Sequence, residues 1–269
     1  MQIEPFKVID LKVRRVPILI SVPHCGIQFP NEIKDHYNQD LIVAPDDTDW
    51  FVHQLYDFAS ELGITMIHAQ YSRWVIDLNR DPDSQPLYND GRIITALSPT
   101  TNFAGDNIYL NGHEPGQDEV DRRLKMYYWP YYHAAQSLLD DLKSEFGKVL
   151  FWDAHSIRQF VPTIRKENFP DLILGDNDQR SANKKLSDAT LTELNKSGLQ
   201  VNHNTPFKGG HLTRYFGKPD VNQHALQLEM TKINYMDNSE TEYDVARAEK
   251  MRGMLKATFN SLINVMDSL

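Results

Sequence analysis

Four short stretches of the sequence each end an apolar run with side chains that can do chemistry. They are "SVPHCG" (21–26), "SRWVIDLNRDP" (72–82), "LFWDAHSIR" (150–158) and "HALQLEM" (224–230). Histidine and carboxylate groups bind divalent metals, arginine binds carboxylates through two parallel hydrogen bonds, and a buried glutamate can serve as a general base. We therefore expect one site to which all four stretches contribute.

His24 and His155 are the candidate metal-binding histidines. His155 lies two residues after Asp153 and shares its face of an extended strand, so the carboxylate is placed to orient the imidazole. A catalytic zinc-type site takes about three protein ligands and keeps one position open. The stretch "PDDTDW" (45–50) supplies candidate carboxylates for the third ligand: Asp46, Asp47 and Asp49. Structural alternatives stay open, namely histidines bonded to backbone carbonyls and aspartates that cap a helix.

The stretch 72–82 mixes charged and apolar residues. As an extended chain it would place Arg73, Asp77 and Asn79 on one face and Arg80 on the other. Burying arginine and aspartate among apolar side chains is costly unless the charges are paired. The stretch is therefore either a structural ion pair or a pair of guanidinium groups that binds carboxylates.

Glu229 projects from an otherwise apolar strand, on the same face as Gln227. A carboxylate held inside such a strand is a candidate general base with a shifted pKa. The alternative is a glutamate on an edge strand.

Hydrophobic patterns predict the elements that must position these residues. Short β-branched and aromatic runs predict strands at 18–22, 64–69, 74–78, 149–153, 171–175 and 224–230. Helical spacing predicts helices at 46–63, at 118–147 with a kink or restart near Pro130, at 181–198, and from about 240 to 265. We predict one α/β domain over residues 1–269, with a mixed, mostly parallel central sheet flanked by helices. Ligands of such sheets bind beyond the carboxyl ends of the strands.

Composition excludes several classes of function. The 269 residues carry a net charge of −9 without a basic block, which argues against nucleic-acid binding. No apolar stretch reaches the length of a membrane span, and the first residues lack the pattern of a secretory signal. A single cysteine fits a reducing compartment, so we expect a cytoplasmic protein. Tyrosine-rich stretches such as "MYYWPYYH" suit either a core or the interface of a homo-oligomer.

A series of motifs resembles the N-formylglutamate amidohydrolase (N-formylglutamate deformylase) family over about residues 16 to 237. The motifs are "SVPHCG", "DTDWFVHQLYDFASELG", "YSRWVIDLNRDP", "LYNDG", "FWDAHSIR", "FKGGHLTRYFGKPD" and "HALQLEMTKINYMD". The resemblance implies a phosphorylase/hydrolase-like fold of the zinc exopeptidase type, related to zinc carboxypeptidases. It also implies a divalent metal, zinc above all, and hydrolysis of N-formyl-L-glutamate to glutamate and formate at the end of histidine breakdown.

Carried over to this sequence, the resemblance assigns a role to each candidate. His24, Asp47 and His155 become the metal ligands, with Asp49 the second choice for the carboxylate. Glu229 becomes the general base. The substrate-facing cations and amides are assigned as follows: Arg73 at the developing oxyanion, Asn79 and Arg80 at one carboxylate, and Arg158, Lys208 or Arg214 at the other.

Three other functions compete with this interpretation. A cysteine amidase would use Cys25, but His24 precedes it directly and would point to the opposite face. A carboxylate-binding protein without catalysis would use the same arginines. A related amidohydrolase would act on another N-acyl acidic amino acid.

Overall fold

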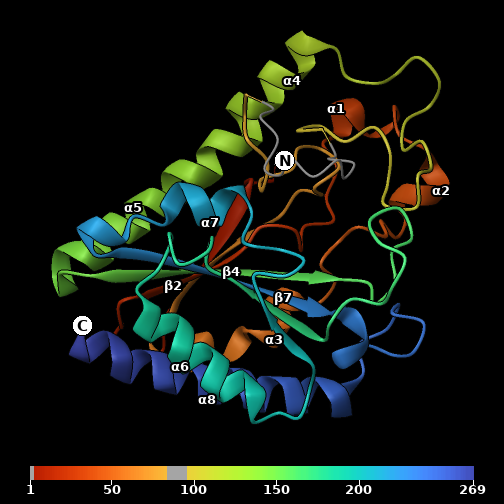
Figure 1. Cartoon of the computed structure of the whole chain (residues 1–269). Coiled ribbons are helices and arrows are strands. Elements are labelled where there is room, and N and C mark those ends of the chain that lie inside the picture. The colour runs from red at the N-terminus through yellow and green to blue at the C-terminus, as the bar shows by residue number, and fades with distance from the viewer. Residues whose placement is uncertain (1–2, 84–95) are drawn as a thin grey trace.

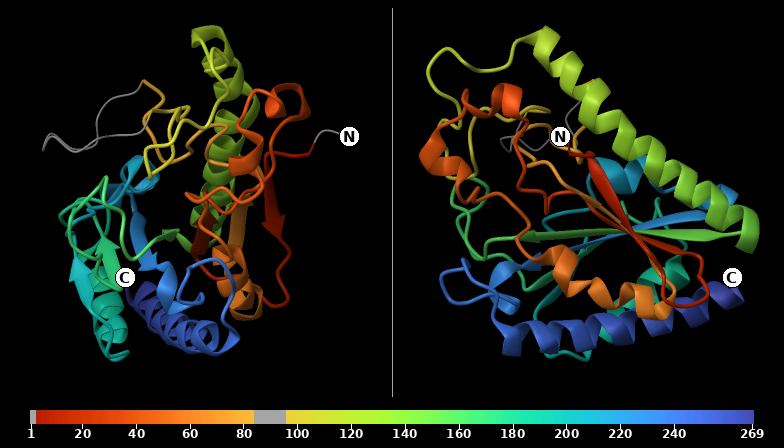
Figure 2. Two further views of the ribbon diagram at one scale, coloured as in Figure 1. Left: turned by 90° about the vertical axis from the view of Figure 1, so that its right-hand side faces the viewer. Right: turned by 180° about the vertical axis from the view of Figure 1, so that it is seen from behind.

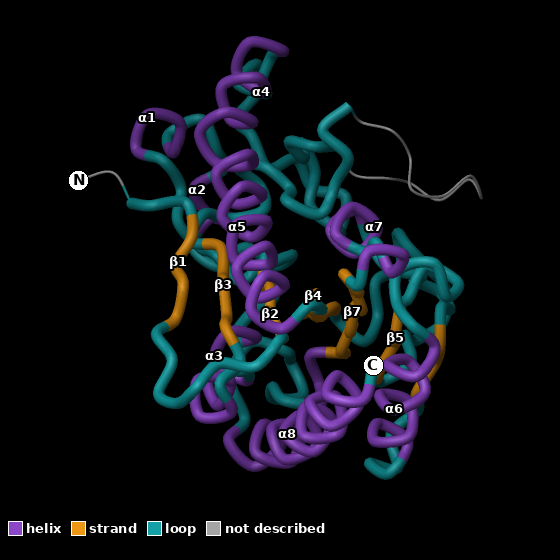
Figure 3. Tube along the Cα trace, turned by 90° about the vertical axis from the view of Figure 1, so that its left-hand side faces the viewer, coloured by secondary structure: helices purple, strands orange, loops and turns teal. Residues whose placement is uncertain are grey.

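The sheet at the centre of the protein contains seven strands in the order β1-β3-β2-β4-β7-β5-β6. The computed structural model describes residues 3–83 and 96–269. The strands are β1 (Phe6–Ile9), β2 (Ile18–Val22), β3 (Thr65–Ala69), β4 (Val149–Ile157), β5 (Leu172–Gly175), β6 (Val201–His203) and β7 (Gln223–Thr231). Strands β3, β2, β4 and β7 run parallel, β1 and β5 lie antiparallel to β3 and β7, and β6 is parallel to β5 (Figure 3). The predicted mixed, mostly parallel sheet is confirmed.

Helices cover both faces of this sheet (Figure 1). The α-helices are α1 (Asn31–Lys34), α2 (Gln39–Ile42), α3 (Val52–Leu55), α4 (Gln117–Arg123), α5 (Trp129–Phe146), α6 (Lys184–Asn195), α7 (His211–Phe216) and α8 (Val245–Ser268). The short 3-10 helices are η1 (Asp57–Leu62), η3 (Pro219–Val221) and η4 (Lys232–Asn234). The segment η2 (Leu124–Tyr128) is a π-helix. Figure 2 shows α5 crossing one face and α8 crossing the other. In the described ranges, no helix combines the length and the hydropathy needed to span a membrane.

The central strands are buried on both faces, because each face packs against helices. Every residue of β2, β4 and β7 is buried. Successive residues of β4 point to opposite layers: Trp152 packs its ring against Phe259 of α8, and Phe151 packs against Phe216 of α7. A charged or polar side chain in these strands must therefore find partners inside the protein.

The predicted strand at 74–78 does not form. Residues 73–80 instead follow a turning path in which the backbone N–H of Asn79 donates to the Asp77 carboxylate at 2.9 Å. This local side-chain to backbone bond competes with strand pairing. Trp74, Val75 and Ile76 are buried in the same hydrophobic cluster as residues of α5. A short apolar run alone does not show whether such residues form a strand or an irregular buried segment. The other five predicted strands are present.

The predicted helix at 46–63 is shorter than expected. Phe51 has a left-handed backbone (φ 63°), so α3 begins only at Val52, and the chain then tightens into η1. Gly63 ends the segment with φ 73°, as its position in the sequence indicated. The acidic residues of 45–51 therefore lie in a loop before α3 and not in the helix.

The predicted helix at 118–147 is present, and the predicted restart near Pro130 is confirmed, because α5 begins at Trp129. The π-helix η2 lies between α4 and α5 and ends before Pro130, which occupies the first turn of α5. Proline is tolerated there because its missing N–H has no partner to lose. The helices predicted at 181–198 and from about 240 to 265 correspond to α6 and α8, whereas β1, β6 and α7 were not predicted.

Candidate active site

His24, Asp49 and His155 meet at the carboxyl ends of β2 and β4. All three are buried, and one ligand atom from each lies within 4.8 Å of the others. His24 follows β2, His155 lies in β4, and the backbone N–H of Asp49 donates to the carbonyl of His24 at 3.0 Å. Oδ2 of Asp49 is 3.2 Å from Nδ1 of His155 and 3.7 Å from Nδ1 of His24. The two histidine rings therefore face one carboxylate through the same ring nitrogen.

The opposite nitrogen of each ring is bonded to a second carboxylate. Nε2 of His24 lies 2.8 Å from Oδ1 of Asp77, and Nε2 of His155 lies 2.9 Å from Oδ1 of Asp153. A carboxylate accepts, so each Nε2 carries the proton and donates it. Such pairs fix the tautomer of metal-binding histidines and leave Nδ1 for the metal.

The three side chains fit a divalent metal. Nδ1 of His24 and Oδ1 of Asp49 are buried and have no hydrogen-bond partner among the described residues. Buried polar atoms are rarely left unsatisfied, and a shared cation would satisfy both. Two imidazole nitrogens and one carboxylate oxygen suit zinc and several other divalent ions.

The electrostatics of the two histidines differ. Burial and the nearby Arg73 lower the pKa of His24 to about 4, so its ring is neutral, which is the form that binds metals. Burial also disfavours the charged ring of His155, but Asp153 and Asp49 outweigh it and raise the pKa of His155 well above its usual value.

Asp47, the expected carboxylate ligand, does not join this group. Its Oδ2 accepts from the indole of Trp74 at 2.9 Å and its Oδ1 accepts from the backbone N–H of Phe103 at 2.9 Å. Both oxygens are thus used in holding neighbouring segments. The assignment is corrected to Asp49, which a sequence with three aspartates in four positions did not separate from its neighbours.

Glu229 lies beside His155, because the two residues are partners in the parallel β4–β7 pair. It is 9% exposed, and the amide of Gln227 approaches its carboxylate at 3.4 Å. Burial raises the pKa of Glu229 to about 8, although His155 and Arg73 act in the opposite direction. A carboxylate with a pKa near neutrality, next to a metal-binding group, suits proton transfer.

The arginines of 72–82 are held by Asp77. Arg73 is buried and donates to Oδ2 of Asp77 at 2.6 Å, and its guanidinium lies over the ring of Phe103. Arg80 is partly exposed and lies 3.8 Å from the same oxygen. The Asn79 amide lies 3.1 Å from Nε2 of His155 and accepts from the backbone N–H of Leu212 at 2.9 Å. The predicted ion pair is present, and its carboxylate also orients His24, a contact that the sequence did not indicate.

The three cations predicted for a second carboxylate take separate positions. Arg158 donates to Asp46 at 2.7 Å and to Glu240 at 3.2 Å. Lys208 pairs with Asp178 at 2.9 Å. Arg214 donates to the carbonyl of Gly209 at 3.1 Å. The motif "LYNDG" (87–91) lies outside the described residues.

Cys25 is poorly suited to nucleophilic catalysis. Its thiol is buried and lies 3.5 Å from the carbonyl of Val22 and 3.6 Å from that of Ala69. Burial raises its pKa, and Asp49 raises it further. A cysteine nucleophile needs the opposite shift, because the thiolate is the reactive form.

The chain is similar to known proteins over almost its whole length. The family described as N-formylglutamate amidohydrolase matches residues 16–236. The N-formylglutamate deformylases of Pseudomonas putida and Pseudomonas aeruginosa are 37% and 39% identical over 260 residues, which is 96% of this chain and 96% of each relative. The crystal structure of N-formylglutamate amidohydrolase from Ralstonia eutropha JMP134 superposes with a TM-score of 0.82 at 26% identity, covering 99% of this chain and 100% of that one.

Proposed function

This chain belongs to the N-formylglutamate amidohydrolase family, and we propose that it hydrolyses N-formyl-L-glutamate to L-glutamate and formate. The observation that carries the proposal is the placement of Glu229 beside a buried His24–Asp49–His155 group. A general base next to a candidate metal-binding group suits the hydrolysis of an amide by an activated water molecule.

His24, Asp49 and His155 would hold the metal, for which we propose zinc. When bound, the metal would supply a Lewis acid for the formyl oxygen and would lower the pKa of water. Asp77 and Asp153 keep the Nδ1 atoms of the two histidines turned toward Asp49. Contacts within the protein thus fix the orientation of both histidine rings.

Glu229 is the proposed general base. It takes a proton from the attacking water as the oxygen adds to the formyl carbon, and it returns that proton to the nitrogen as the C–N bond breaks. Its raised pKa favours both transfers near neutral pH, because a group near its pKa gives and accepts protons with similar ease.

Arg80 and Asn79 are the proposed contacts for a substrate carboxylate. Arg80 is about one fifth exposed, so its guanidinium is accessible at the site. Arg73 was expected at the oxyanion. Its bond to Asp77 instead supports a positioning role, in which it holds the carboxylate that orients His24.

Formate release tests the proposed function. Purified protein is stripped with a chelator, reloaded with zinc, and assayed with N-formyl-L-glutamate, N-acetyl-L-glutamate and N-formyl-L-aspartate, with release of the free amino acid measured alongside formate because the acetyl compound would give acetate. We expect turnover of N-formyl-L-glutamate by the reloaded protein and its loss on chelation. Full activity of metal-free protein would exclude this mechanism, and preference for another acyl group or side-chain length would identify a different amidohydrolase of the family.

A further inference from the structure

Lys232 is a buried cation that the roles above do not use. It follows β7 directly, three residues after Glu229, and is 2% exposed. Its Nζ donates to the backbone carbonyl of Asp46 at 2.8 Å. Within residues 3–83 and 96–269, no carboxylate oxygen lies within ion-pair distance of this ammonium. Buried lysines are normally paired with an anion. An ammonium group has three N–H donors, each of which needs an acceptor.

Lys232 lines a cavity of about 150 Å³. One water molecule needs roughly 10–15 Å³ of such space, so the cavity accommodates a short side chain. Its walls lie at the same edge of the sheet as the His24–Asp49–His155 group: Ser156 and Ile157 end β4, the strand of His155, and Lys232 directly follows β7. A ligand in this cavity would therefore lie beyond the carboxyl ends of the same strands.

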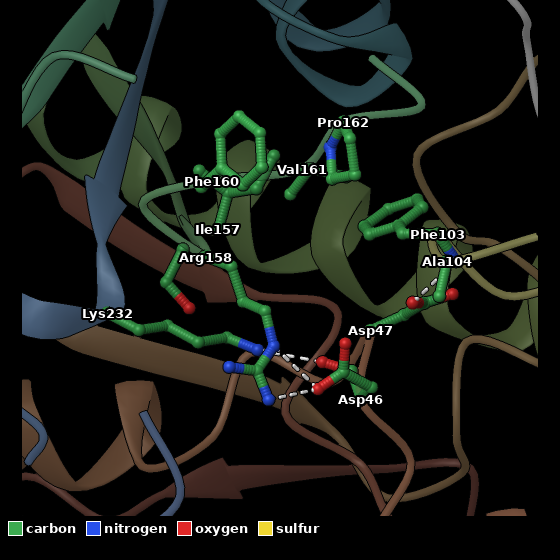
Figure 4. Close-up of a pocket in the computed structure, with 11 residues that line it drawn as sticks. Asp46, Asp47, Phe103, Ala104, Ile157, Arg158, Phe160, Val161, Pro162 and Lys232 are labelled. Carbon is green, nitrogen blue, oxygen red and sulfur yellow. Dashed lines mark hydrogen bonds and ion pairs between the residues drawn. The ribbon is translucent and has the colours of Figure 1, made fainter. Parts of the chain in front are cut away.

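The cavity is apolar on one side and charged on the other (Figure 4). Phe160, Val161 and Pro162 form the upper side in this view, and Lys232 and Arg158 extend toward Asp46 along the lower side. Such a cavity suits a ligand with a short apolar stem and an anionic end.

The other charges of the lower side already have partners. Arg158 is bonded to Asp46 and Glu240, and both oxygens of Asp47 accept from Trp74 and Phe103. The largest favourable charge acting on Lys232 is that of Asp49. Asp46 and Asp47 act in the same direction, and Arg158 opposes them.

We propose that Lys232 binds the side-chain carboxylate of the substrate and thereby selects acidic N-formyl amino acids. The two methylene groups of the substrate would lie against Val161 and Phe103, and the carboxylate would accept from Nζ. This inference rests on the proposed function, because it assigns the second of the two carboxylates of N-formyl-L-glutamate to a residue.

The test compares two substrates that differ only in charge. Lys232→Met is assayed with N-formyl-L-glutamate and with N-formyl-L-glutamine, whose side chain is neutral, using the zinc-loaded protein. We expect kcat/KM for N-formyl-L-glutamate to fall about 100-fold or more, which is the range for loss of a buried charge pair, and kcat/KM for N-formyl-L-glutamine to change less than about threefold. The matched control is Lys185→Met, which removes an exposed lysine of α6 and should leave both values unchanged. Equal losses on both substrates, or no loss on either, would overturn the proposal.

Two further measurements keep the result decisive. Lys232→Gln retains an N–H donor for the Asp46 carbonyl, so it replaces Lys232→Met if that variant fails to fold, and it should show the same selective loss. Calorimetric binding of L-glutamate and L-glutamine to the zinc-loaded wild type and variant separates this proposal from the proposed function. Selective loss of glutamate binding in the variant would support the role of Lys232 even if the wild type released no formate, and equal binding by both proteins would refute it.

Discussion

Nε2 of His24 lies 2.8 Å from Oδ1 of Asp77, and Oδ2 of the same carboxylate accepts from Arg73 at 2.6 Å. One buried aspartate therefore orients a candidate metal ligand and balances an arginine. Arg73 and Arg80 hold the pKa of Asp77 well below its usual range against the opposing effect of burial, so it is a carboxylate throughout the working pH range. We therefore expect the metal affinity to depend on Asp77, although this residue is not one of the three candidate ligands.

Asp77→Asn should weaken zinc binding by roughly 10- to 100-fold, the range for loss of a carboxylate that supports a metal-binding histidine. The amide keeps the shape of the side chain but removes the charge that fixes the tautomer of His24. Competition with a chelating indicator measures the change. Asp188→Asn on the exposed surface of α6 removes one acidic charge elsewhere and should leave the zinc affinity unchanged. An unaltered zinc affinity in Asp77→Asn would contradict the orienting role.

Asp49→Asn and Asp47→Asn separate the two aspartates that the sequence left in competition. Asp49→Asn should lose zinc on dialysis, because an amide oxygen is a weaker ligand than a carboxylate. Asp47→Asn should retain zinc and instead lower the thermal stability, because it disturbs the bonds to Trp74 and Phe103. Metal analysis after dialysis and a thermal melt of each variant give the result, and the reverse pattern would restore Asp47 as the ligand.

We predicted from the sequence that His24, His155 and Glu229 would share one site, because the ends of strands can be recognised in a sequence. His24, His155 and Glu229 each follow or end a run of apolar residues, and parallel strands bring such ends to one edge of a sheet. The aspartate that faces the two histidines could not be identified from the sequence in the same way. Asp46, Asp47 and Asp49 lie in a loop, where the left-handed turn at Phe51 and the contacts of each carboxylate decide which one faces the histidines.

Contacts between distant segments set the other limit on prediction. Two hydrogen bonds join residues that are far apart in the chain: Asp77 with His24, and Lys232 with the carbonyl of Asp46. No local pattern encodes them. The strand predicted at 74–78 was wrong for a related reason. A segment buried by packing and a strand buried in a sheet contain the same apolar residue types.

Arg80→Ala should raise KM for N-formyl-L-glutamate with a smaller effect on kcat. Loss of a cation that binds substrate and transition state alike appears mainly in KM. Steady-state formate release at saturating zinc measures both parameters. An unchanged KM would remove Arg80 from the substrate site.

Glu229→Gln should lower kcat by at least ~100-fold while zinc remains bound, because the amide cannot take the proton of the attacking water. The side chain keeps its size and its place beside His155. Formate release and metal content are measured on the same preparation. Near-normal turnover with full zinc occupancy would exclude Glu229 as the base.

Glu229→Gln should lower the activity but raise the free energy of unfolding of the metal-free protein at high pH. Burial raises the pKa of Glu229 from an ordinary 4.5 to about 8, so folding favours its protonated form. The stability that comes from this proton is complete below about pH 4.5 and is lost as the pH rises through 8. The glutamine of Glu229→Gln is neutral at every pH, so the variant should match the wild type near pH 5. At pH 9 it should exceed the wild type by on the order of 2 kcal/mol or more in the free energy of unfolding. Urea unfolding of both metal-stripped proteins at the two pH values measures the difference, and equal gaps at pH 5 and pH 9 would show that Glu229 does not carry this shift.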